Sequence, residues 1–255
     1  MVDRLRERGV AVTFNSNAIL LDRTRGTALI GAGLPELRVS IDGASRETYR
    51  LMRGVDTLGR VCANLAAFAA LKSALGSTSP KVSLWLVATR RTIEELPDLV
   101  EMALELGAAE IYVQRLVYFG AGTAREELAI FGQASEREAE ILAQCEWRCR
   151  ELGIGFAASG AVDPRISVAA AGGERPWQAC NRPYSLTYIT ANGNVLSCCF
   201  VPFTGRRYAE AILGNVFEQS LAEIWQGARY SAFRARFEGD TPPQWCAGCG
   251  SKWSV

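Results

Sequence analysis

The chain has 255 residues, with 28 basic side chains, 27 acidic ones and no histidine. The missing imidazole excludes Ser-His-Asp and Cys-His triads and every zinc site that contains histidine. A net charge of +1 is unlike that of a protein that binds bulk nucleic acid or an anionic membrane. Any chemistry must therefore come from carboxylates, thiolates, hydroxyls or a bound cofactor.

The start of the chain does not have the pattern of a targeting signal. Residues 1–8 carry charges of both signs and contain no apolar core. No apolar run approaches the roughly 18 to 20 residues needed to cross a bilayer. We therefore expect a soluble, cytoplasmic protein with neither a membrane nor a nucleic acid as partner.

Strand and helix patterns alternate through the first half of the chain. A long helical stretch, broken near Gly54, separates the second predicted strand from the third, and a helix that ends at Gly107 separates the third from the fourth. The latter helix starts at a Thr92-x-x-Glu95 capping box. Alternation at this spacing predicts parallel βαβ units. The predicted strands span residues 9–14, 36–41, 81–88 and 110–116.

Polar side chains cluster where these strands end. In parallel α/β sheets the chemistry lies at the carboxyl ends of the strands. The candidates there are Asn15, Ser16, Asn17, Ser40, Asp42, Arg90, Arg91 and Gln114.

A further helix is predicted from Ser135, where Ser135 and Glu138 form a second capping box. Cys145 and Cys149 fall on the apolar stripe of this helix, so we interpret both as core thiols rather than ligands. Cys62 lies in the long helical stretch and receives the same interpretation.

The composition changes after residue 156, where Gly, Ala, Pro and Ser become frequent. Asn192-Gly193, between two β-rich runs, predicts a hairpin. A third capping box, Ser220 with Glu223, predicts a helix. We expect two domains, at residues 1–155 and 156–255.

Four cysteines of this second part form a pattern. Cys180 and Cys198 flank the predicted hairpin, and Cys246 and Cys249 form a C-x-x-C pair. Two pairs of thiolates make an all-sulfur site, which suits zinc or an iron–sulfur cluster. The first pair is not a C-x-x-C knuckle, which favours a cluster over a zinc ribbon. Cys199 is either a spare thiol or an alternative ligand.

The order of these motifs resembles a known family. The four cysteines, Gly193, residues 212–216, residues 220–225 and Arg234 are similar to the auxiliary-cluster extension, called SPASM or twitch, of radical S-adenosylmethionine (SAM) enzymes. The segment Asn15–Leu21 resembles the third-strand Thr-Asn-Gly segment of the radical SAM barrel, with Ala18 in place of glycine. Residues 39–43, followed by Ser45, Glu47, Thr48, Tyr49, Arg53 and Gly54, resemble its fourth-strand segment.

The resemblance implies an α/β fold: an incomplete radical SAM (β/α) partial barrel with about four of six strands, then a small cysteine-ligated α+β extension. It implies cleavage of SAM to a 5′-deoxyadenosyl radical that modifies a peptide or small-molecule substrate, with an electron-donor protein as partner. Asn17, Ser40 and Asp42 would lie along the SAM site. Cys180, Cys198, Cys246 and Cys249 would hold one auxiliary 4Fe–4S cluster. No catalytic residue is assigned.

The sequence also departs from that family. It contains no Cys-x-x-x-Cys-x-x-Cys loop, and a Gly-Gly-Glu-Pro motif is missing from its usual place. A first parallel strand without a neighbour would be an open edge. We therefore expect Met1 to be an internal or mis-assigned start of a longer protein. The alternative is a degenerate homologue or a non-catalytic scaffold with a four-cysteine zinc or iron–sulfur site.

Overall fold

The computed structural model describes residues 1–116, 125–130, 135–158, 177, 180–203 and 208–247. The chain forms two compact units. The first comprises described residues within Met1–Leu116 and Leu128–Ala169, and the second those within Val117–Glu127 and Ala170–Val255. No helix among the described residues combines the length and the apolar character needed to span a membrane.

The first unit is built on a parallel sheet of five strands in the order β1-β2-β3-β4-β5. All four predicted strands are confirmed, although the first begins and ends later than expected. The sheet has one strand more than the four predicted, because the short run Gly155–Ala158 pairs with the fourth strand. The strands are β1 Thr13–Ser16, β2 Glu36–Ser40, β3 Lys81–Ala88, β4 Glu110–Arg115 and β5 Gly155–Ala158.

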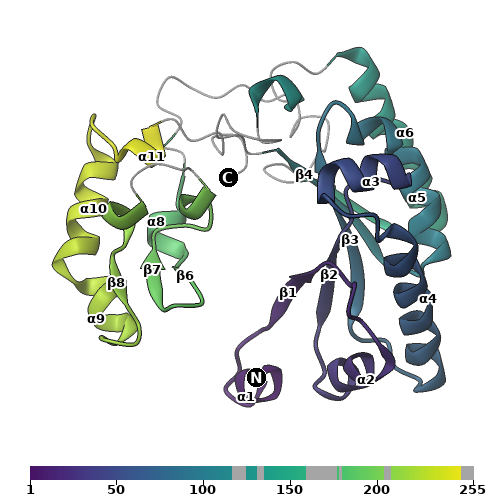
Figure 1. The fold of residues 1–255 in the computed structure, drawn as a ribbon, viewed down its shortest axis with the longest axis horizontal. Helices are drawn as coiled ribbons and strands as arrows, with labels where there is room; N and C mark the ends of the chain where they lie inside the picture. Colours follow the sequence, from purple (N-terminus) through teal and green to yellow (C-terminus); the bar gives the residue numbers. More distant parts are fainter. Residues whose placement is uncertain (117–124, 131–134, 159–176, 178–179, 204–207, 248–255) are drawn as a thin grey trace. The chain divides into compact units, whose positions relative to one another are not determined.

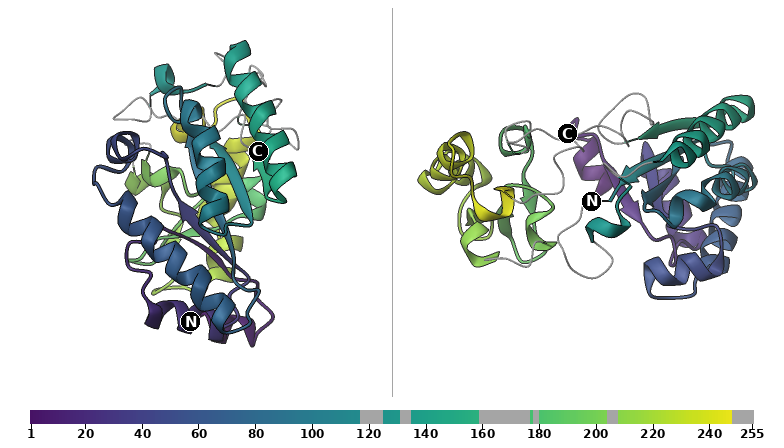
Figure 2. Two further views of the ribbon diagram at one scale, coloured as in Figure 1. Left: turned by 90° about the vertical axis from the view of Figure 1, so that its right-hand side faces the viewer. Right: turned by 90° about the horizontal axis from the view of Figure 1, so that it is seen from above.

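Helices connect these strands, and α4, α5 and α6 lie along one side of the sheet (Figures 1 and 2). The helices are α1 Val2–Arg6, α2 Arg23–Gly31, α3 Arg46–Arg53, α4 Leu58–Ala74, α5 Leu96–Glu105 and α6 Glu136–Leu152, with short 3-10 helices η1 Thr92–Glu95 and η2 Glu126–Leu128. The break predicted near Gly54 is confirmed, since Gly54 ends α3 with a φ of 74°.

The core of the first unit lies between the sheet and these helices. In β2, β3 and β4 every second residue faces it and is buried, as Leu37, Leu84 and Ile111 are. Leu65 of α4 and Leu99 of α5 belong to the same apolar cluster. The two-residue alternation of strand side chains thus assigns one face of the sheet to the core.

One local prediction needs correction, and one helix was missed. Thr92 does not cap a helix: its hydroxyl donates to the Val87 carbonyl at 2.7 Å and accepts from the Thr89 N–H, which fixes the turn after β3. The helix α2 was not predicted from the sequence. Its N-cap is Asp22, whose carboxylate accepts from the Arg25 N–H.

The turn between β2 and α3 is held by a carboxylate from another element. Glu95 in η1 accepts hydrogen bonds from the Ala44 N–H at 2.8 Å, the Ser45 N–H at 2.9 Å and the Ser45 hydroxyl at 2.6 Å. Ser45 in turn caps α3 through the Thr48 N–H. A side chain at Gly43 would meet the backbone nitrogen of Tyr49 at 2.9 Å, so only glycine allows this close approach.

The helix α6 follows the prediction closely. The capping box of Ser135 and Glu138 is present, and Cys145 and Cys149 are buried in the core. Burial raises the pKa of Cys145 to about 12 and that of Cys149 to about 11. Cys62, in α4, is half-buried against the same core, and burial raises its pKa too. These three thiols are therefore structural, as predicted.

The second unit contains a three-stranded antiparallel sheet and short helices. Its elements are α8 Arg182–Ser185, β6 Tyr188–Ile189, β7 Asn194–Leu196, η4 Val201–Phe203, η5 Tyr208–Ala211, β8 Gly214–Asn215, α9 Leu221–Gln226, α10 Ala228–Glu238 and α11 Gln244–Ala247. The predicted hairpin and the capping box of Ser220 and Glu223 are both confirmed. Gly193 has a φ of 83°, and a side chain there would lie 2.5 Å from the Asn215 side-chain oxygen.

Arg234 joins the elements of this unit. Its guanidinium carbon lies 4.3 Å from the ring centre of Trp225 and 4.2 Å from that of Tyr230. The same side chain donates to the Pro183 carbonyl at 3.1 Å and to the Trp225 carbonyl at 3.0 Å. Arg234 therefore ties α10 to α9 and to the segment that follows Cys180.

We predict that Glu95→Gln destabilises the protein by about 1 kcal/mol at pH 7, because a charged acceptor of three hydrogen bonds is lost from a partly exposed site. Burial opposes ionisation of Glu95, but the hydrogen bonds from Ser45, Thr48 and Ala44 lower its pKa. When the pKa of a carboxyl is lower in the folded state than in the unfolded state, its ionised form stabilises the fold. This stabilisation is complete above the pKa of the unfolded state, about 4.3, and is lost as the pH falls through the pKa of the folded state. The difference between wild type and variant in urea unfolding should therefore shrink from pH 7 to pH 4.

The matched control is Glu94→Gln, since Glu94 is the exposed neighbour and makes one ion pair, with Arg137 at 3.2 Å. We expect a change within about 0.5 kcal/mol there. Equal effects at the two positions would contradict the role given to Glu95.

We predict that Arg234→Lys destabilises the second unit by roughly 1–3 kcal/mol, because an ammonium cannot stack on two rings while donating to two carbonyls. Urea unfolding followed by tryptophan fluorescence would measure it. Arg229→Lys, on the exposed part of α10, should be neutral, and a loss of the same size there would refute the stacking argument.

Candidate functional site

Asn17 and Ser40 lie at the same edge of the sheet. Ser16, the last residue of β1, pairs with Val39, so the residues that follow both reach the carboxyl edge. Asn17 is exposed and accepts a hydrogen bond from the Ile19 N–H at 3.1 Å, and Ser40 is half-buried at the end of β2. The fold thus brings together two of the three residues predicted for the SAM site.

The turn after β1 carries backbone strain at Ala18. Its φ of 54° is in the left-handed region, which glycine occupies far more readily than alanine. The side-chain amide of Asn64 donates to the carbonyls of Ala18 at 2.8 Å and Ile19 at 3.0 Å. Together with the Ser16 hydroxyl, which accepts from the Ala18 N–H, these contacts hold the turn.

Asp42, the third predicted residue, is buried and engaged within the protein. One carboxylate oxygen accepts from the Val87 N–H at 2.8 Å, and the other pairs with Arg53 at 2.7 Å. Burial raises the pKa of Asp42, although Arg53 and the Val87 N–H oppose that change. In this structure Asp42 joins β2 to β3 and to α3, and thereby positions the turn next to Ser40.

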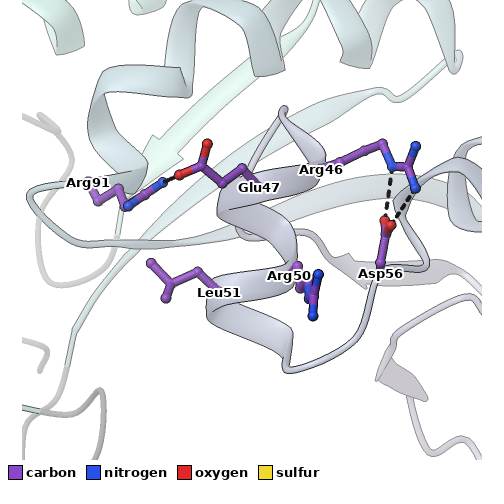
Figure 3. Close-up of a pocket in the computed structure, with 6 residues that line it drawn as sticks. All are labelled: Arg46, Glu47, Arg50, Leu51, Asp56 and Arg91. Atoms are coloured by element: carbon purple, nitrogen blue, oxygen red, sulfur yellow. Dashed lines mark hydrogen bonds and ion pairs between the residues drawn. The ribbon is translucent and has the colours of Figure 1, made fainter.

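A surface pocket lies over α3, beside this edge (Figure 3). It is lined by Arg46, Glu47, Arg50, Leu51, Asp56 and Arg91. Two ion pairs, Arg46 with Asp56 and Arg91 with Glu47, connect α3 to the loops around it. Because most of its charged side chains pair with one another, we interpret the pocket as a structural feature of the surface rather than as a binding site.

The sheet face opposite the helices carries a polar and aromatic layer that was not predicted. Glu36 accepts from Arg38 at 2.9 Å and from the Ser83 hydroxyl at 2.7 Å, and the latter accepts from the Trp85 indole N–H at 3.0 Å. Arg38 lies 4.6 Å from the ring centre of Trp85, which stacks on Tyr112 at 3.9 Å.

The signal for this layer was present in the sequence. Glu36, Arg38 and Ser40 alternate with apolar residues along β2, and a strand buried on both faces would not alternate in this way. Gln114 continues the layer on β4, opposite Val87. On the helix side of β4, Arg115 is 1% exposed, and burial lowers its pKa to about 10.

Three of the four predicted metal-binding cysteines can be described. Cys180, Cys198 and Cys246 are half-buried, and all three pack against the same apolar cluster of the second unit. Cys246 lies in α11, and Cys198 follows β7 by two residues. Cys249 lies outside the described residues. Within the described part of the chain, no three Cys, Asp or Glu side chains converge closely enough to hold a metal ion.

Buried donors beside these cysteines fit an acceptor that is not part of the polypeptide. Nε1 of Trp177, Nη1 of Arg182 and Nε1 of Trp245 are buried and have no hydrogen-bond partner among the described residues. A buried donor left unpaired costs about 1–3 kcal/mol. Soft thiol ligands together with spare N–H donors suit a sulfur-rich cluster.

The sequence is similar to a known domain family and to several known proteins. Residues 180–250 match the SPASM family, an iron–sulfur cluster-binding domain. The chain is 26% identical over 232 residues to AdoMet-dependent heme synthase of Methanosarcina barkeri, a match that covers 87% of this chain. It is 25% identical over 255 residues to PqqA peptide cyclase of Granulibacter bethesdensis, a match that covers 98% of this chain. The chain spans 62% of the length of each of these relatives.

Solved structures share the fold at low sequence identity. Streptococcus suis SuiB matches all of this chain and 57% of its own, with a TM-score of 0.69 and 17% identity. The enzyme anSMEcpe, solved with bound AdoMet, matches 95% of this chain and 65% of its own, with a TM-score of 0.60 and 14% identity. The SPASM match over residues 180–250, together with similarity to the heme synthase and the peptide cyclase over 87% and 98% of the chain, supports a radical SAM protein with a SPASM extension.

Proposed function

We propose that this chain is part of a radical SAM enzyme that cleaves SAM to methionine and a 5′-deoxyadenosyl radical. The radical would abstract hydrogen from a peptide or small-molecule substrate. In this proposal Cys180, Cys198, Cys246 and Cys249 hold one auxiliary 4Fe–4S cluster, and Asn17 and Ser40 line the SAM site.

The observation that carries the cluster assignment is the SPASM match over residues 180–250, a range that includes all four cysteines. The buried, unpaired N–H groups of Trp177, Arg182 and Trp245 support it. When bound, such a cluster supplies one-electron transfer or a coordination site for substrate. The chain's own part is to supply four thiolates, exclude water with the apolar cluster around them, and hold the Cys180 segment through Arg234.

The SAM assignment rests on the carboxyl edge of the sheet. Asn17 and Ser40 lie there together, and Asp42 holds the adjoining turn from within. Structures that share this fold contain SAM, namely SuiB bound to S-adenosylmethionine and anSMEcpe with bound AdoMet. We assign Asp42 to positioning, because Val87 and Arg53 engage its two oxygens.

The similar proteins indicate two possible classes of substrate. One is a PqqA peptide cyclase and another a heme synthase, while SuiB has been solved with its precursor peptide SuiA. The proposal therefore covers a peptide or a small molecule, and an electron-donor protein as partner.

We predict that the anaerobically reconstituted wild-type chain binds about four irons and is brown. Cys180→Ala and Cys246→Ala should each lose most of the iron, because a cluster needs its thiolate ligands. The matched control is Cys145→Ala, which removes a thiol from the core of the first unit and should retain full iron. Iron analysis and visible absorption would measure these outcomes.

Two results would contradict the ligand assignment. One is equal iron loss in Cys145→Ala and Cys246→Ala. The other is a colourless wild-type protein that carries zinc, which would favour a non-catalytic metal-binding scaffold.

We predict that Ser40→Ala and Asn17→Ala each weaken SAM binding about tenfold, equivalent to about 1.4 kcal/mol, because each removes a polar contact. Equilibrium dialysis with labelled SAM on the reconstituted protein would measure the affinity. Ser73→Ala, in the last turn of α4, should bind like wild type. Unchanged affinity in both site variants would refute the SAM assignment.

A further inference from the structure

In the second unit, four buried side-chain atoms have no hydrogen-bond partner among the described residues. They are Nε1 of Trp177, Nη1 of Arg182, Nη2 of Arg234 and Nε1 of Trp245. All four are N–H donors, and an unpaired buried donor is unfavourable unless a ligand accepts its hydrogen bond.

Three of these donors are next to proposed cluster ligands in the sequence. Trp177 precedes Cys180 by three residues, and its carbonyl accepts from the Cys180 N–H at 3.0 Å. Arg182 follows Cys180 by two residues, and Trp245 directly precedes Cys246. Spare donors thus accompany both the first and the third ligand.

Arg182 also reaches the segment that carries the second ligand. Its guanidinium carbon lies 4.4 Å from the ring centre of Phe200, which is two residues beyond Cys198. A half-buried cation, whose Nη1 atom is buried, therefore connects the two segments that carry Cys180 and Cys198. Trp245 is 8% exposed, and its ring is parallel to that of Phe233, so its orientation is fixed by packing.

The chemistry of a thiolate-ligated cluster matches such donors. The cluster with four thiolates is an anion, and its sulfurs accept hydrogen bonds from N–H groups. Reduction adds a negative charge, so a nearby cation or N–H donor stabilises the reduced form more than the oxidised form. Such contacts therefore raise the reduction potential.

We propose that Arg182 and Trp245 donate N–H hydrogen bonds to sulfur atoms of the auxiliary cluster and raise its reduction potential. This inference rests on the proposed function, since it requires the cluster to be bound by the four cysteines. It assigns to two non-ligating side chains the control of when the cluster accepts an electron.

The test is a potential titration of the anaerobically reconstituted full chain, followed by electron paramagnetic resonance of the reduced cluster. The variants are Arg182→Met, Arg182→Lys and Trp245→Phe. The controls are Arg229→Met, which removes an exposed positive charge of the same unit, and Trp147→Phe, which changes an exposed tryptophan of the first unit.

We expect Arg182→Met to keep its iron and to titrate at a lower potential. At the wild-type midpoint the ratio of oxidised to reduced cluster should rise about tenfold, which is 59 mV for a one-electron couple. Arg182→Lys should shift less, because it keeps the charge. Trp245→Phe should shift in the same direction and lose an exchangeable-proton coupling to the reduced cluster, and both controls should match wild type.

Full iron with unchanged potentials in Arg182→Met and Trp245→Phe would overturn this inference and leave the ligand assignment intact. Iron loss in both Arg182 variants as complete as in Cys180→Ala would also overturn it, because Arg182 would then be needed for assembly. A wild-type chain that binds no iron would overturn the proposed function as well.

Discussion

Side-chain alternation along the parallel strands is the constraint from which the first unit follows. In β2, β3 and β4 every second residue faces the helices, and those positions are buried and, apart from Arg115, apolar. The remaining positions lie on the opposite face of the sheet. A connected polar and aromatic layer forms there from Glu36, Arg38, Ser83, Trp85 and Tyr112. The parallel pairing of β1 with β2 then brings Asn17 and Ser40 to one edge of the same sheet.

The second unit is held together less by an apolar core than by the contacts of one arginine. Its apolar cluster is small, and much of its cohesion comes from Arg234 stacked between rings and bonded to two carbonyls. Buried N–H groups beside the cysteines are left for another acceptor. In such a domain a bound cluster would contribute to folding as well as to chemistry, because its binding free energy adds to a core of limited size.

The sequence predicted elements whose local signals agreed with their tertiary role. Lys81–Ala88 is an uninterrupted β-type run, and Ser135 with Glu138 is a complete capping box. The strand Gly155–Ala158 consists mostly of small residues and forms through pairing with β4, which no local pattern reveals. Thr92 does not cap a helix, because its hydroxyl donates a hydrogen bond to the Val87 carbonyl instead. Likewise, the motif placed Asp42 beside a cofactor, whereas only the packing revealed that Val87 and Arg53 already engage it.

The burial of Cys145 and Cys149 has a consequence for the assembly of the protein. Iron binds thiolate, and burial raises the pKa of Cys145 to about 12, so this thiol stays protonated near neutral pH. Once the first unit has folded, these two sulfurs are withdrawn from competition for incoming metal and for oxidants. Burial thereby favours metal binding at the half-buried cysteines of the second unit, which are the ligands proposed above.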